Sequence, residues 1–225
     1  VFGKLLNCGQ TCVAPDYIYC HESVRDQLAD AIVDEIIRQY TSDAISNPDY
    51  GKIINEKHYN RIMGLISEEK TIFGGEGDKD KLKINPTVMT KVTWDDPVMQ
   101  EEIFGPLIPV LTFTDVDEAI ETINSHPHPL ALYVFTESKK TARRFLNECQ
   151  FGGGCVNDTI IHLASTSLPF GGVGESGMGS YHGYNGFKAF SHFKGIVDKK
   201  TWMDMPIRYQ PYSKGAEILL KIFMR

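Results

Sequence analysis

The sequence lacks a long hydrophobic run and an excess of positive charge. None of its 225 residues lies in a stretch approaching the ~18 consecutive apolar residues that a membrane-spanning helix needs. Lys and Arg number 23 against 29 Asp and Glu, for a formal net charge of −6, whereas nucleic-acid-binding domains carry clustered basic residues. The sequence also opens without the basic and then apolar pattern of a secretory leader. These absences predict a cytoplasmic protein that binds neither a membrane nor nucleic acid.

Cysteine is scarce and metal-ligand patterns are missing. The five cysteines form an odd set with no C-x-x-C spacing, which argues against a disulfide framework and a structural zinc site. His126 and His128 alternate with two prolines in a turn and have neither a third ligand nor a nearby carboxylate. We therefore expect a protein of a reducing compartment that binds no metal.

The sequence does contain alternating strand and helix patterns. Runs of apolar residues predict strands at Pro15–Cys20, Thr71–Phe73, Lys83–Val88, Leu107–Phe113, Ala131–Thr136 and Gly154–Asn157. Amphipathic spacing predicts helices at Ser23–Tyr40, Asn55–Glu69, Asp115–Ser125, Ser138–Cys149 and Ala216–Phe223. This alternation predicts an α/β fold, with a mainly parallel sheet and helices on both of its faces.

The character of the sequence changes near residue 191. We expect one large domain over residues 1–190, followed by an extended arm and tail over residues 191–225, with the extended part at Phe193–Val197. The first residues, VFGKLLNCGQ, contain no initiator Met and read as the end of an element. The chain is therefore expected to be a piece of a longer protein.

Cys12, in the pattern N-x-G-Q-T-C, is the first candidate for chemistry. A nucleophilic thiol needs backbone that permits close approach, which Gly9 would supply, and nearby N–H donors that favour the thiolate. Taken alone, a cysteine is more often a small buried hydrophobic residue. We assign that role to Cys20, Cys149 and Cys155, which fall inside predicted elements with no polar companions.

Two further clusters are each ambiguous alone. Glu101–Pro106 contains paired carboxylates before an aromatic residue and a Gly-Pro turn, as a solvated helix end would. Leu168–Gly177 is rich in glycine, which requires special backbone geometry or close approach. Without the pattern of a P-loop or of a dinucleotide fingerprint, tight packing explains that glycine loop better than a phosphate site does.

Taken together and in this order, these clusters resemble the aldehyde dehydrogenase superfamily, in particular its class 3 or fatty-aldehyde branch. The resemblance extends over about Asn7 to Tyr212. The segments that carry it are Asn7–Tyr17, Glu101–Pro106, Pro129–Phe135 and Leu168–Gly183 with the following Phe190-Ser191-His192.

The resemblance implies a role for each matching residue. Cys12 would be the nucleophile that attacks the aldehyde carbon, and hydride transfer to NAD or NADP would leave a thioester that water hydrolyses. Glu102 would hold the nicotinamide ribose, and Phe104 would lie beside the nicotinamide ring. Phe170, Leu163 and Ala164 would line the pocket for an apolar aldehyde, medium- or long-chain aliphatic or aromatic. The resemblance also implies a homodimer, a catalytic domain over residues 1–190 and an oligomerisation strand in the arm.

Family features upstream of the nucleophile have no counterpart in the sequence. The general-base Glu, the Asn of the oxyanion hole and the cofactor-binding domain all precede the nucleophile in the family, and no Glu precedes Cys12 here. These residues alone are therefore expected to be inactive. Two alternatives stay open: an acyl-transferring or acyl-reducing relative with the same fold, and a non-catalytic domain that acts by association.

Overall fold

The computed structural model describes residues 1–211 and 213–223, which form two compact units, Val1–Phe190 and Ser191–Arg225. In the second unit the segment 191–200 has no regular secondary structure, and a 3-10 turn at Pro206–Arg208 precedes helix α7 (Lys214–Phe223). None of the helices in the described part of the chain is long and apolar enough to cross a membrane. The roles predicted for the two parts of the chain stay predictions.

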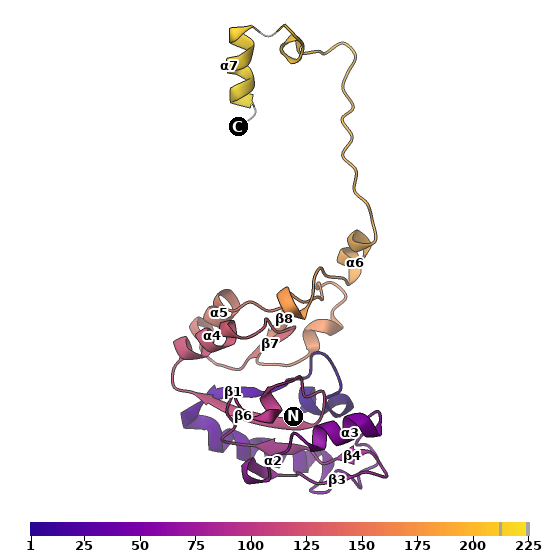
Figure 1. Cartoon of the computed structure of the whole chain (residues 1–225), viewed down its shortest axis with the longest axis vertical. Helices are drawn as coiled ribbons and strands as arrows, with labels where there is room; N and C mark the ends of the chain where they lie inside the picture. Colours follow the sequence, from indigo (N-terminus) through magenta and orange to yellow (C-terminus); the bar gives the residue numbers. More distant parts are fainter. Residues whose placement is uncertain (212, 224–225) are drawn as a thin grey trace. The chain divides into compact units, whose positions relative to one another are not determined.

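The first unit is built around a four-stranded sheet in the order β1-β6-β5-β2. Two of these strands, β1 and β6, are labelled in Figure 1. Strands β1 (Ile18–His21) and β5 (Thr87–Met89) both run parallel to the central strand β6 (Leu107–Phe113). Strand β2 (Thr71–Phe73) is an antiparallel edge beside β5. The predicted α/β fold is confirmed, with a sheet that is mainly parallel and mixed at one edge.

Two smaller strand pairs accompany this sheet. Strands β7 (Ala131–Val134) and β8 (Gly153–Val156) are parallel. Strands β3 (Gly77–Asp78) and β4 (Lys83–Ile84) form an antiparallel hairpin. The helices of this unit are α1 (Phe2–Leu5), α2 (Arg25–Tyr40), α3 (Glu56–Met63), α4 (Val116–Ser125), α5 (Lys139–Glu148) and α6 (Gly183–Ala189).

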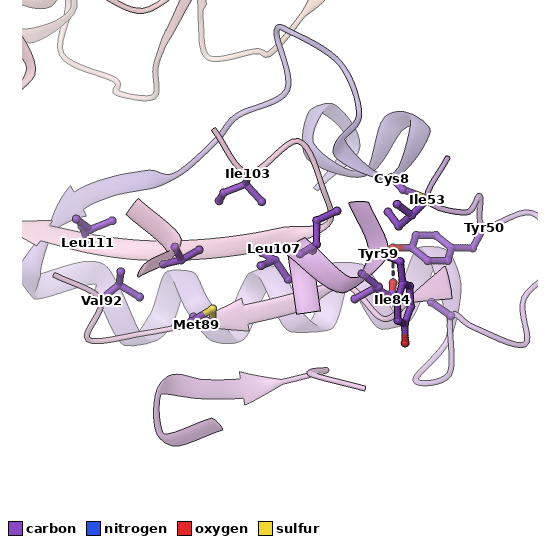
Figure 2. Packing of buried hydrophobic residues seen from close by; sticks show 13 residues of the cluster. Cys8, Tyr50, Ile53, Tyr59, Ile84, Met89, Val92, Ile103, Leu107 and Leu111 are labelled. Atoms are coloured by element: carbon purple, nitrogen blue, oxygen red, sulfur yellow. Dashed lines mark hydrogen bonds between the residues drawn. The ribbon is translucent and has the colours of Figure 1, made fainter. Parts of the chain in front are cut away.

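Alternating side chains of β6 face two different hydrophobic clusters, as the period of a strand requires. Leu107 and Leu111 join the cluster that contains Ile62 of α3, part of which is drawn in Figure 2. Ile108 and Val110 join the cluster that contains Ile36 of α2. Helices therefore cover both faces of the sheet, as the alternation of elements predicts.

Some predicted boundaries are wrong for identifiable reasons. Helix α3 ends at Met63 and not at the predicted Glu69. Gly64 caps its C-terminus, and only a 3-10 turn follows at Glu68–Lys70. The strand predicted at Lys83–Val88 is two short strands, because Pro86 has no N–H to donate to a ladder. The start of α4 is as predicted, since the Asp115 side chain accepts a hydrogen bond from the backbone N–H of Glu118.

The contact of α2 with the sheet predicts a difference between two adjacent isoleucines. Ile36 is 0% exposed and Ile37 is 41% exposed. Replacing Ile36 with Ala should lower the free energy of unfolding by about 2–5 kcal/mol, because a cavity remains where the side chain packed. Ile37→Ala is the matched control and should change it by less than about 0.5 kcal/mol. Equal losses in urea unfolding of the two variants would contradict this account of the core.

Candidate active site

The loop that carries Cys12 follows α1 and a 3-10 turn at Leu6–Gly9. Asn7, Cys8 and Gly9 have φ angles of 52°, 56° and 75°, three successive left-handed residues that turn the chain sharply. A side chain at Gly9 would collide with the backbone carbonyl of Gly105, so glycine is required at this position. The backbone of the Cys12 loop therefore lies directly against that of the Glu101–Pro106 segment.

The side chain of Gln10 fixes the other side of this loop. Its Nε2 donates to the backbone carbonyls of Asn7 and Lys52, both at 3.0 Å. Its Oε1 accepts from the backbone N–H of Ile54, also at 3.0 Å. One amide thus connects the loop to a segment more than forty residues away in sequence.

Exposure separates Cys12 from the other cysteines. Cys12 is exposed, Cys155 is half-buried, and Cys8, Cys20 and Cys149 are buried. Burial raises the pKa of the Cys8 thiol, which lies beside Tyr50 in the core. A buried thiol with a raised pKa stays protonated and is a poor nucleophile. Cys12 is therefore the most accessible of the five thiols.

Glu102 and Phe104 are both exposed, on a turn whose backbone is held from behind. The Arg61 guanidinium donates to the carbonyl of Ile103 at 2.5 Å and of Glu102 at 3.3 Å, and pairs with the Glu101 carboxylate at 2.8 Å. Buried Ile103 anchors the turn in the core, while Phe104 has a left-handed φ of 47°. The two side chains predicted to contact a cofactor thus extend from a turn whose backbone is held by hydrogen bonds and by a buried side chain.

Asp16 is the second support of this turn. Its Oδ1 accepts a hydrogen bond from the backbone N–H of Ile103 at 3.0 Å. Burial raises the pKa of the Asp16 carboxyl, and Lys4 and Arg61 oppose that rise. Partial desolvation and the charge of Asp16 likewise raise the pKa of Glu102. The carboxylates of Asp16 and Glu102 are therefore close enough to repel each other, and both feel the cations nearby.

Of the predicted substrate-pocket residues, Phe170 belongs to a group of aromatic rings. Phe170 stacks on His182 with a centroid distance of 5.7 Å and lies 6.1 Å from His162. Leu163 and Ala164 follow His162 in a 3-10 turn and are exposed. The structure thus brings Phe170 together with His162, the residue directly before Leu163.

Tyr133 connects this aromatic group to the Cys12 loop, and motif reasoning assigns it no role of its own. Its hydroxyl donates to the carbonyl of Val13, the residue after Cys12, at 2.7 Å. Its ring lies 5.9 Å from that of His162. The expectation that Cys155 has no polar companion is wrong, because its Sγ lies 3.6 Å from Nδ1 of His162. Only the parallel pairing of β7 with β8 brings these residues together.

No metal site accompanies these residues. In residues 1–211 and 213–223, no three His, Cys, Asp or Glu side chains form a group that could hold a metal ion. The polar groups at the candidate site are an exposed thiol, an exposed carboxylate and backbone donors. Such a set suits covalent chemistry at a carbonyl carbon and hydrogen bonding to sugar hydroxyls.

Comparisons with known proteins agree with this arrangement. The 4,4'-diaponeurosporen-aldehyde dehydrogenase of Staphylococcus aureus is 47% identical over all of this chain, which covers 49% of that protein. The dimeric, NADP-preferring aldehyde dehydrogenase of Bos taurus is 46% identical over 85% of this chain and 80% of its own length. The structure described as the substrate-bound state of Staphylococcus aureus AldH matches 100% of this chain and 49% of its own, with a TM-score of 0.92 and 46% identity.

This chain spans about half the length of most of the curated relatives it matches. The family model described as "Aldehyde dehydrogenase family" matches residues 1–196, which include every residue of the candidate site. The chain therefore belongs to the aldehyde dehydrogenase family.

Proposed function

We propose that this chain is the thiol-bearing half of an NAD(P)-dependent aldehyde dehydrogenase that oxidises apolar aldehydes to carboxylic acids. The observation that supports this most directly is the packing of the Cys12 loop on the Glu101–Pro106 turn through Gly9 and Gly105. An exposed thiol and an exposed carboxylate are thereby carried on two adjoining, well-supported backbones. An association domain would need neither feature.

The chemistry begins at Cys12. Its thiolate attacks the aldehyde carbon and forms a thiohemiacetal, while the carbonyl oxygen takes the negative charge and accepts a hydrogen bond from the Cys12 backbone N–H. The bound nicotinamide supplies a hydride acceptor, and loss of hydride from carbon leaves a thioester on Cys12. Water then attacks the thioester, which releases the carboxylic acid and returns the thiol.

Glu102 and Phe104 fit the cofactor in chemistry. The exposed carboxylate of Glu102 has two acceptor oxygens for the vicinal ribose hydroxyls. Phe104, two residues on and 40% exposed, has an open ring face for the nicotinamide. Since both residues stand on the turn held by Arg61 and Asp16, they would keep a fixed spacing while the cofactor binds.

An apolar aldehyde fits the side chains around Phe170. The group contains Tyr133, Phe170 and Tyr181, and exposed Leu163 follows His162, another of its rings, in the chain. We assign Phe170, Leu163 and Ala164 to the aldehyde pocket. The relative in Staphylococcus aureus is likewise named for an aldehyde, 4,4'-diaponeurosporen-aldehyde.

We further propose a cytoplasmic homodimer that uses NAD or NADP. The odd set of unpaired cysteines supports a reducing compartment. A relative whose name includes "dimeric NADP-preferring" supports both the dimer and a dinucleotide cofactor. In this proposal the backbone of the segment Phe193–Val197 adds to the sheet edge of a partner copy, and its exposed Phe193, Ile196 and Val197 side chains pack against that copy.

Replacing Cys12 tests the proposed nucleophile. In the full-length protein, Cys12→Ala should reduce NAD(P)H formation from an apolar aldehyde such as octanal by at least about 10³-fold, because no thiohemiacetal can form. Cys149→Ala is the control, since that thiol is buried against α4 and should leave turnover within a few-fold of wild type. Turnover that survives Cys12→Ala would refute the thiol mechanism, and an inactive full-length wild type would refute the dehydrogenase.

The 225 residues alone should not catalyse oxidation of an aldehyde. Family members place the general-base Glu, the oxyanion Asn and the cofactor-binding domain before the nucleophile, and only eleven residues precede Cys12 here. When the purified chain is mixed with aldehyde and NAD or NADP, the absorbance at 340 nm is expected to rise no faster than in a sample without protein. Production of NAD(P)H by this chain would show that residues upstream of the nucleophile are not needed for the reaction.

A further inference from the structure

Cys12 stands on a turn of the backbone whose position decides where the thiol points. The backbone N–H of Ala14 donates to the carbonyl of Thr11 at 3.1 Å, which closes a four-residue turn with Cys12 as its second residue. The third residue, Val13, is 4% exposed and belongs to the core, whereas Cys12 is exposed. The direction of the thiol and of the Cys12 N–H therefore depends on how this turn is held.

The hydroxyl of Tyr133, on strand β7, holds the turn from outside. It donates to the Val13 carbonyl at 2.7 Å, the usual length of a good O–H···O hydrogen bond. Burial raises the pKa of the Tyr133 hydroxyl. The hydroxyl therefore stays protonated, and remains a donor, in the alkaline range where a cysteine thiol of ordinary pKa ionises.

The same hydroxyl also reaches the turn that carries the predicted pocket residues. The effect of burial on the pKa of Tyr133 is opposed by a hydrogen bond from the backbone of Ile160. Ile160 is 7% exposed and has a left-handed φ of 54°, a conformation that is rare for a β-branched residue. It directly precedes the 3-10 turn Ile161–Ala164. The Tyr133 hydroxyl thus joins two turns, the one that carries the thiol and the one that carries Leu163.

Packing contacts surround this junction. The ring of Tyr133 lies 5.9 Å from the ring of His162. His162 in turn packs over Gly153 of β8, where a Cβ would lie 3.1 Å from Cδ2 of that ring. A side chain on Gly3 of α1 would collide with the side chain of Thr159. The two segments that the hydroxyl joins are therefore packed together, and the hydroxyl supplies a polar link between them.

We propose that Tyr133 is a positioning residue: its hydroxyl fixes the Val13 carbonyl and so holds the Cys12 thiol in a constant orientation toward the aldehyde pocket. This inference rests on the proposed function, in which Cys12 attacks an aldehyde bound beside Phe170. The hydroxyl itself takes no part in the chemistry. A thiol held near its attack geometry reacts faster than a mobile one, so the hydroxyl acts on the rate and not on the affinity for the aldehyde.

The first test compares two aldehydes in the full-length protein. Tyr133→Phe removes only the hydroxyl and should lower the single-turnover rate of NAD(P)H formation about tenfold, for octanal and propanal alike. KM for octanal should stay within about twofold, because the ring and its apolar surface remain. Tyr19→Phe is the matched control, since it removes the hydroxyl of another half-buried tyrosine, whose ring packs on Trp94 and Phe113. It should leave both quantities unchanged.

The second test measures the turn without any substrate. Amide hydrogen exchange of Ala14, whose N–H closes the turn, should be several-fold faster in Tyr133→Phe than in wild type or in Tyr19→Phe. If Tyr133→Phe does not fold, the hydroxyl proton of Tyr133 is followed in the wild type by NMR with labelled tyrosine. It should exchange slowly with water, as a hydrogen-bonded proton does, and rapid exchange would overturn the proposal.

The outcomes separate this inference from the proposed function. An unchanged rate with both aldehydes, or unchanged exchange at Ala14, would overturn the positioning role. So would a loss confined to KM for octanal, which would make Tyr133 a wall of the pocket, or an equal loss in Tyr19→Phe, which would point to a general effect on the fold. A full-length wild type that oxidises no aldehyde would refute the proposed function, and the exchange of Ala14 would still decide whether Tyr133 holds the turn.

Discussion

The candidate site depends on one close approach of two backbones. Gly9 lies so close to Gly105 that any side chain on Gly9 would occupy the space of the Gly105 carbonyl. This contact joins the loop of the exposed thiol to the turn of the exposed carboxylate. Gln10 on one side, and Arg61 with Asp16 on the other, fix each backbone in turn. The geometry is therefore set by contacts to the main chain, and the side chains of Cys12 and Glu102 are left exposed.

Local patterns predict most of the elements but not all of their ends, and they give no sign of the short elements α1, β3 and α6. Strand β6 is predictable at its observed bounds because its first five residues are apolar and buried, on both faces of the strand. The cap of α4 was predictable because Asp115 bonds a residue only three positions away. The pattern of apolar residues continues past Gly64 and Pro86, whereas the helix ends before Gly64 and the strand is broken at Pro86. The pattern alone therefore predicts elements that are too long at both positions.

For the candidate site, the sequence motifs point to residues whose side chains are exposed and miss the residues that support their backbone. Cys12, Glu102 and Phe104 stand in recognisable segments. Arg61 bonds a turn about forty residues away, and Tyr133 bonds a carbonyl 120 residues away, so neither contact has a local signature.

The amide of Gln10 has a consequence for chemical ageing of the protein. Its NH₂ group serves two backbone carbonyls, and its oxygen serves one backbone N–H. Deamidation to glutamate would replace both donors with an acceptor that faces two carbonyl oxygens, so attraction would become repulsion at the base of the Cys12 loop. A change of one mass unit at Gln10 would thus weaken the connection between the Cys12 loop and the segment at Lys52 and Ile54.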